Sequence, residues 1–198
     1  DPVRNQLGQI AIAVATAVNS QQREGMDLYG NLGSDLFAVG PVGVQAGSGN
    51  AGSGTVAVTR ASIGSLTAND YILEYSGSAW SARRADTGAP VALAGAGTPA
   101  SPFVADGLSI VVGGAPAAGD TYKITPTAGA IHGMSVLFTD PGRVAAAAPI
   151  RTGATLANTG SGSISAGEVL DAGNPALRSS VSIAFIDATH YSVNGAGS

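Results

Sequence analysis

The sequence predicts an α+β protein that is mainly β, with an N-terminal amphipathic helix of the coiled-coil type followed by antiparallel β-rich domains. Three observations predict this class. Apolar residues within positions 1–24 recur at steps of three and four, whereas those after position 55 alternate with polar residues. A third observation is that stretches rich in glycine, alanine and serine separate these patterns, so we expect several parts along the chain.

The N-terminal stretch carries the helical pattern. Asp1 suits a helix cap, Pro2 suits the first helical position, and Gly25 suits the stop. The apolar stripe of this helix, predicted to pack on another helix, consists of Val3, Leu7, Ile10, Val14 and Ala17. Ile12 lies on the opposite side, where we expect a lone exposed apolar residue; the alternative is a second helix contact.

The shift from helical to alternating periodicity predicts four parts. These are a helical (coiled-coil) domain segment 1–45, a linker 46–54, a β-rich domain 55–150, and a second, incomplete β-rich unit 151–198 with a Gly/Ser-rich connection. Glycines recur between 38 and 54, which indicates a flexible connection rather than an element.

Alternation and turn residues predict the strands of the β-rich parts. We expect one pair around Gly77, a second pair formed by 108–112 and 122–124, a strand at 134–138, a short helix at 143–148, and a further strand at 181–185. The inward positions of these strands predict the β-domain core, namely Tyr71, Leu73, Tyr75, Trp80, Leu108, Ile110, Tyr122 and Ile124.

The composition of the chain narrows the class of protein to which it can belong. Hydrophobic residues make up 44% of the chain, but Ala and Gly occupy 65 of the 198 positions, so the core is lean. The net charge of −4 and a single lysine, Lys123, argue against binding nucleic acid. No apolar run is long enough for membrane insertion, and the absence of cysteine excludes disulfides and thiolate sites. The chain begins at Asp1 without methionine, so we expect an internal fragment.

Motifs that could carry chemistry lack their required context. The string from Gly47 to Gly52 matches the dinucleotide fingerprint, but the residues that follow predict a strand rather than a helix. Oxygen ligands at Asp27, Asn31 and Asp35 do not keep a calcium-loop spacing, so we expect them to cap a helix end and its turns. The two histidines, at 132 and 190, have no metal-binding partner nearby in sequence. We therefore predict no enzyme, no cofactor and no metal site.

One aromatic group leaves an alternative open. Tyr71, Tyr75, Trp80 and Tyr122 are four of only ten aromatic residues, so packing in the core is their expected role. A platform that stacks on sugars is the alternative, and it would make the protein an extracellular carbohydrate-binding or adhesin-like β module.

Two runs of residues resemble flagellar hook-associated protein 1, the hook–filament junction family. The first run is Asn19, Gln21, Gly25, Met26, Asp27, Gly30, Gly33, Asp35 and Phe37. The second includes Asp70, Tyr71, Leu73, Tyr75, Gly77, Trp80, Phe103, Asp106, Gly107, Leu108, Ile110, Gly113, Pro116, Gly119, Asp120, Tyr122, Ile124, Pro126, Thr139, Asp140, Pro141 and Ala145. The resemblance covers roughly residues 1–148, and residues 183–191 look like the start of a further β unit.

This resemblance implies a non-enzymatic structural component of the bacterial flagellum, a ring subunit that joins hook and filament. The implied partners are other copies of the full-length protein, the hook protein and the adjacent junction protein. The implied location is extracellular, reached through the flagellar type III channel without a cleaved signal peptide. Because terminal helices polymerise the subunits of this family and are missing here, we expect this fragment to be monomeric.

Overall fold

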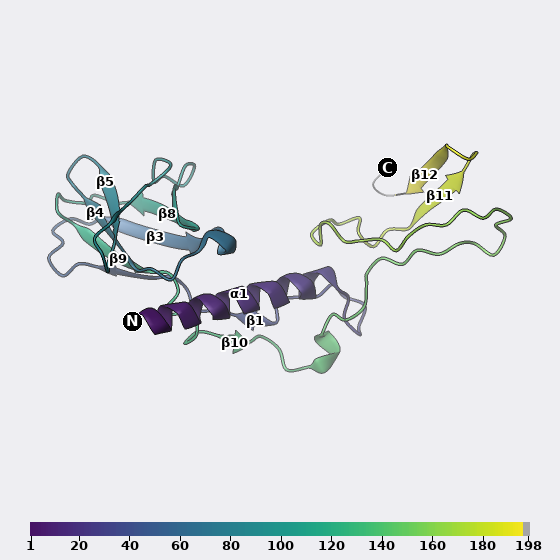
Figure 1. The fold of residues 1–198 in the computed structure, drawn as a ribbon, viewed down its shortest axis with the longest axis horizontal. Helices are drawn as coiled ribbons and strands as arrows, with labels where there is room; N and C mark the ends of the chain where they lie inside the picture. The colour runs from purple at the N-terminus through teal and green to yellow at the C-terminus, as the bar shows by residue number, and fades with distance from the viewer. Residues whose placement is uncertain (196–198) are drawn as a thin grey trace. The chain divides into compact units, whose positions relative to one another are not determined.

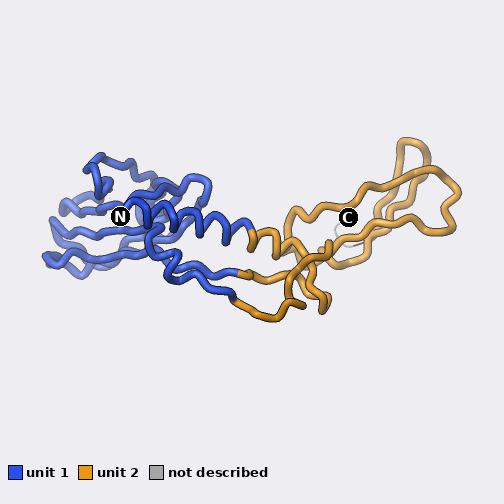
Figure 2. Tube along the Cα trace, turned by 60° about the horizontal axis from the view of Figure 1, so that its bottom comes forward, with its two compact units in different colours: residues 1–17, 37–136 blue, residues 18–36, 137–198 orange. Residues whose placement is uncertain are grey.

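The computed structural model describes residues 1–195 of the chain. These residues divide into two compact units, coloured separately in Figure 2. Unit 1 comprises residues 1–17 and 37–136, and unit 2 comprises residues 18–36 and 137–198. The helix α1 (Pro2–Glu24) contributes residues to both units. One N-terminal helix followed by antiparallel sheets confirms the predicted fold class.

Unit 1 contains two larger antiparallel sheets, whose main strands are labelled in Figure 1, and one two-stranded sheet described below. The five-stranded sheet has the order β2 (Gly43–Ala46), β9 (Thr121–Thr125), β4 (Tyr71–Tyr75), β5 (Trp80–Arg84) and β6 (Pro90–Val91). The three-stranded sheet has the order β3 (Thr55–Arg60), β8 (Leu108–Gly113) and β7 (Phe103–Ala105). A short 3-10 helix, η1 (Ile63–Ser65), follows β3.

Strands β8 and β9 belong to different sheets, although the sequence predicts that they pair with each other. The expected pairing of 108–112 with 122–124 is wrong, because β8 pairs with β3 and β7 whereas β9 pairs with β2 and β4. The six residues of β8 match the six of β3 along their whole length, from Thr55 opposite Gly113 to Arg60 opposite Leu108. The pairing of β8 with β3 over its whole length therefore decides the sheet to which β8 belongs, and the short turn between β8 and β9 does not. Around Gly77, by contrast, β4 and β5 do form a hairpin.

The core of unit 1 joins the inner faces of both sheets to one residue of α1. Its fully buried members include Leu73 and Leu108 from the strands and Ile12 from the helix. Tyr71, Ile110, Tyr122 and Ile124 are buried in the same cluster. Tyr75 and Trp80, which the sequence predicts as core residues, are instead half-buried, and Trp80 packs against the core cluster. They lie opposite each other beside the turn that closes the hairpin, where the sheet ends.

Segments at the two ends of the β region differ from the sequence prediction. Within 38–54, expected to be a flexible connection, residues 43–46 form β2 at the edge of the larger sheet. The expected strand at 134–138 shrinks to β10 (Ser135–Val136), which pairs with β1 (Phe37–Ala38). The expected helix at 143–148 is absent. A 3-10 turn, η2 (Pro141–Arg143), precedes an extended segment there, because Ala147 pairs with Met26 instead.

Unit 2 ends in a hairpin formed by β11 (Val181–Phe185) and β12 (Tyr191–Gly195). At its turn the Asp187 carboxylate accepts hydrogen bonds from the backbone N–H groups of Thr189 and His190, at 2.8 and 2.9 Å. These bonds and the side chain of His190 lower the pKa of Asp187 to about 2. No strand or helix interrupts residues 149–180 of the described chain.

Candidate assembly surface

Helix α1 carries two opposite faces, and the apolar one points outward. The exposed fractions are 71% for Val3, 53% for Leu7, 59% for Ile10 and 49% for Val14. Ala17 at the end of the stripe is exposed as well. The stripe that the sequence predicts to pack on another helix is therefore uncovered in unit 1.

The inward face of α1 is polar or small, and it also repeats at alternating steps of three and four. The buried positions of the helix are Asn5, Gly8, Ile12, Ala15, Asn19 and Gln22. The expectation that Ile12 is a lone exposed residue is wrong, because its side chain is 1% exposed and lies in the β-domain core. The alternative, a second contact of the helix, is nearer the truth, although the contact is with sheets and not with a helix.

In unit 1 the inward face of α1 contacts the backbone of the β domain as well as its apolar core. The Asn5 amide nitrogen donates to the Ala68 carbonyl at 3.2 Å and to the Asp70 carboxylate at 2.9 Å. A Cβ at Gly8 would overlap the backbone carbonyl of Thr127, so the helix approaches the β domain as closely as a glycine allows. The absence of a side chain at position 8 therefore sets the packing distance.

In unit 2 the same face ties the helix end to the segment that follows η2. The Gln22 amide donates to the Arg143 carbonyl at 2.7 Å and accepts from the Ala145 N–H at 3.0 Å. Next to it, Met26 and Ala147 exchange two backbone hydrogen bonds of 2.7 and 3.2 Å. Residues 22–26 are thereby fastened to residues 143–147, which lie more than a hundred positions later in the chain.

The contrast between the two faces of α1 indicates a role for the outer, apolar face. On the inner face, the amides of Asn5 and Gln22 form hydrogen bonds with backbone groups, as buried polar atoms require, and Gly8 allows the close approach. Burying a fully exposed large apolar side chain stabilises by about 1.5–3 kcal/mol, and the outer-face side chains, which are 49–71% exposed, would gain part of this on full burial. A continuous stripe of such residues, left uncovered by unit 1, is a typical surface for packing against another helix.

The side chains considered as cation ligands have structural partners. Asp27 accepts hydrogen bonds from the N–H groups of Tyr29 and Asn31, at 2.9 and 2.7 Å, which forms an Asx turn after the helix. Asp35 forms an ion pair of 2.6 Å with Arg23. Within residues 1–195, no three His, Asp or Glu side chains gather as a metal site would require.

The glycine-rich string from Gly47 to Gly52 is held by a carboxylate of its own chain. Asp120 is 1% exposed, and its oxygens accept from the N–H groups of Ala51 at 2.8 Å and Ala117 at 2.9 Å. The backbone bond from Ala117, together with those from Ala51 and Gly52, lowers the pKa of this carboxyl. Strand β3 follows this loop, so the helix that a pyrophosphate site needs is not there.

The four aromatic residues separate into two groups. The rings of Tyr75, Trp80 and Tyr122 pack in series, with centroid distances of 5.0 and 5.9 Å. Tyr71 is buried elsewhere in the sheet, and its hydroxyl donates to the Asp106 carboxylate at 2.7 Å. The rings of the first group contact one another, as they do in a packed sheet margin.

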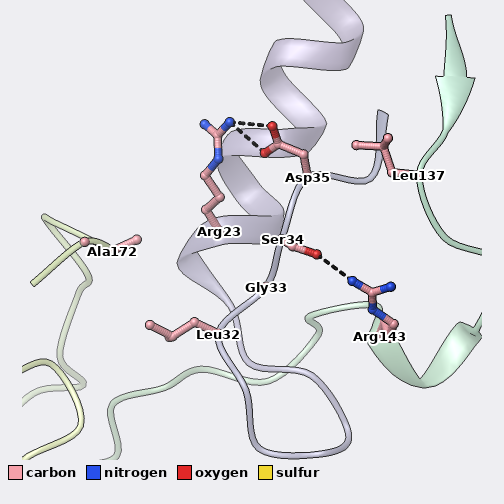
Figure 3. A pocket seen from close by; sticks show the side chains of 9 residues that line it. Arg23, Leu32, Gly33, Ser34, Asp35, Leu137, Arg143 and Ala172 are labelled. Carbon is pink, nitrogen blue, oxygen red and sulfur yellow. Dashed lines mark hydrogen bonds and ion pairs between the residues drawn. The ribbon is translucent and has the colours of Figure 1, made fainter. Parts of the chain in front are cut away.

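Unit 2 has a surface hollow of about 610 Å³, shown in Figure 3. Arg23 and Asp35 meet on one wall, and Arg143 donates to the Ser34 hydroxyl at 3.1 Å. Leu32, Leu137 and Ala172 supply apolar lining. The Arg143 guanidinium also lies 4.4 Å from the centre of the Phe138 ring.

Sequence reasoning identified the outer stripe of α1 but missed the inner face. The signal was present, because Asn5, Gly8, Ala15, Asn19 and Gln22 share the spacing of the stripe on the opposite side. Amides and small residues do not count as apolar positions when a helix is searched for hydrophobic periodicity. This face was therefore interpreted as solvent-exposed. None of the helices among residues 1–195 has the length and apolar character needed to cross a bilayer.

Comparison with known proteins places this arrangement in a class of flagellar proteins. The family model "Flagellar hook-associated protein FlgK helical domain" matches residues 1–37, and "Flagellar hook-associated protein 1, D2-like domain" matches residues 45–126. Flagellar hook-associated protein 1 of Escherichia coli is 34% identical over 149 residues, which is 74% of this chain and 26% of that protein. The Salmonella typhimurium protein of the same name is 35% identical over 150 residues, with the same two coverages.

A solved structure shares the fold as well as the sequence. The flagellar hook junction protein FlgK from Burkholderia pseudomallei is 34% identical, with a TM-score of 0.82, over 93% of this chain and 33% of that one. The chain therefore belongs to the flagellar hook-associated protein 1 family. It spans about a quarter of the length of the curated relatives it matches.

Proposed function

We propose that this chain is part of a structural protein that joins hook and filament in the bacterial flagellum as a self-assembling ring subunit. The observation that carries the proposal is the uncovered stripe of α1, from Val3 to Ala17. Its relatives are named as hook-associated or hook junction proteins, and α1 lies in the part matched by the family's helical domain. In the full-length protein another helix covers the stripe.

The proposed partners follow from that role. They are other copies of the full-length protein, the hook protein on one side and the adjacent junction protein on the other. The protein acts outside the cell in the flagellum, after export without a cleaved signal peptide. The proposal includes no catalytic step, no cofactor and no metal.

Light scattering on two proteins tests the proposal. The 198-residue chain stays monomeric at micromolar concentration, because a helix of this length exposes too short an apolar seam to associate stably on its own. The full-length protein forms larger particles under the same conditions. A stable high-order ring from the 198-residue chain would place the assembly contacts within these 198 residues. A full-length protein that never assembles, even on isolated hook–basal bodies, would contradict the proposed function.

A further inference from the structure

An exposed apolar pair lies on a rigid turn of unit 2. Leu28 is 83% exposed and Tyr29 is 62% exposed, and we refer to these two residues as the knob. The turn beneath them is held by Asp27, by a hydrogen bond of 2.9 Å from the Leu28 N–H to the Gly142 carbonyl, and by a bond of 3.0 Å from the Tyr29 hydroxyl to the Asp140 carboxylate. Because the turn already fixes the backbone, only the side chains of the knob have to be ordered when a partner covers them.

The hollow described above lies in the same unit, and neither knob residue lines it. Its volume of about 610 Å³ accommodates a leucine side chain, and part of its lining is apolar. Its ionisable groups are Arg23, Arg143 and Asp35, which sum to a positive charge. The knob is flanked instead by two carboxylates, those of Asp27 and Asp140.

From this complementarity of shape and charge, we propose that the knob of one copy inserts into the hollow of the next copy. The contact is heterologous, because it joins two different surfaces of the same unit. Heterologous contacts generate rings or helical arrays, whereas an isologous contact stops at a dimer. The inference rests on the proposed self-assembly and names a surface that carries it.

The contact is too small to hold copies together by itself. Stable interfaces bury about 1,200–2,000 Å² in total, far more than two side chains on a turn supply. The knob therefore acts in the assembled full-length protein, where other contacts raise the effective concentration of neighbouring surfaces. It specifies which surfaces meet rather than supplying most of the affinity.

Disulfide trapping tests the contact directly, since these 198 residues contain no cysteine. One batch of full-length protein carries Leu28→Cys and a second carries Ala172→Cys, after replacement of any cysteine elsewhere. The two batches are mixed, allowed to assemble and oxidised. A covalent dimer that contains both variants can form only between copies. The control replaces Leu28→Cys by Val104→Cys, a 49% exposed position in unit 1.

The inference predicts at least tenfold more mixed dimer with Leu28→Cys than with Val104→Cys, and only under assembling conditions. Equal yields from the two mixtures, with normal particles by light scattering, would overturn the knob contact and leave the proposed function standing. If the unsubstituted full-length protein forms no particles under these conditions, the inference and the proposed function fail together. Leu28→Ser provides a second test. It should leave the melting temperature unchanged, because Leu28 is exposed in the single chain. It should weaken assembly about tenfold, because the apolar side chain that the neighbouring copy would cover is lost. Unaltered assembly of this variant would also overturn the inference.

Discussion

At the scale of single residues, Gly8 shows how one missing side chain positions a helix. A Cβ there would overlap the Thr127 carbonyl, which belongs to the backbone and cannot rotate away. Gly8→Ala would ordinarily favour a helix by about 1 kcal/mol. Here we expect it to lower the free energy of unfolding by about 1–3 kcal/mol, because overpacking outweighs propensity.

Urea unfolding followed by the fluorescence of Trp80, the single tryptophan, measures this change. Gly64→Ala is the matched control, since a Cβ at that position would meet nothing within 4 Å. If both variants unfold at the same urea concentration, Gly8 does not set the helix position.

Tyr71 links stability to alkaline pH. Burial, with the nearby Asp106 carboxylate, raises the pKa of its hydroxyl from 10.0 to about 12. Because the folded-state pKa lies above the unfolded one, the stabilisation is complete below pH 10 and is lost as the pH rises towards 12. Tyr71→Phe removes both the hydrogen bonds and this pH dependence.

We therefore expect Tyr71→Phe to be less stable than the parent at pH 7 by about 1 kcal/mol, the usual net value of such a bond. Urea unfolding at pH 7, 10 and 11 should show that the gap between the two proteins narrows at the higher pH values. A gap of constant size would mean that Tyr71 titrates normally in the folded protein.

At the scale of elements, α1 reverses the usual orientation of an amphipathic helix. Ile10 belongs to the regular apolar stripe and is 59% exposed, whereas Ile12 is outside that stripe and is 1% exposed. We expect Ile12→Ala to cost about 2–5 kcal/mol, as for a buried isoleucine. Ile10→Ala should change the stability of this chain by less than about 0.5 kcal/mol.

The two substitutions remove the same atoms from the same helix, so urea unfolding of both isolates the effect of burial. Ile10→Ala should become costly only in the full-length protein, where we propose that another helix covers the stripe. Equal losses in the 198-residue chain would mean that the stripe is already covered.

The last hairpin shows an element that lacks a core of its own. The apolar residues on one face of β11 and β12 are 39–61% exposed: Val181, Ile183, Phe185, Tyr191 and Val193. A two-stranded hairpin is marginally stable without a third strand or a packed layer. In the described residues these two strands pair only with each other.

At the scale of the whole molecule, stability is unevenly distributed between the two units. Unit 1 holds the hydrophobic core, whereas residues 151–168 are all exposed. A chain ending at residue 148 should therefore unfold within about 0.5 kcal/mol of the full 198 residues when Trp80 is the probe. A larger loss would show that the C-terminal segment supports unit 1.

Limited proteolysis reports the same difference along the chain. Arg151 and Arg178 lie in exposed, irregular backbone. Arg83 is part of β5 and forms an ion pair of 2.6 Å with Glu74. Because proteases cut where the chain opens easily, trypsin should cleave after Arg151 and Arg178 well before Arg83. Mass spectrometry of early fragments would detect the reverse order, which would contradict this distribution.

The predictable parts of the fold depend on short-range patterns. The hairpin around Gly77 joins strands that are neighbours in sequence, so alternation and one turn residue are enough to predict it. The pairing of β3 with β8 spans about fifty residues, and no local pattern reveals it. Local reasoning therefore placed β8 beside β9, which belongs to the other sheet.

The sequence by itself determined the fold class, the existence of α1 and its apolar stripe, because periodicity reports directly which side chains share a face. Only the tertiary structure decided which face of α1 turns inward. Hydrophobicity favours burial of the stripe, but Asn5 and Gln22 find backbone partners inside, and Gly8 permits the close approach. Those partners lie between 63 and 123 positions away in the chain, so the choice depends on contacts that no local pattern encodes.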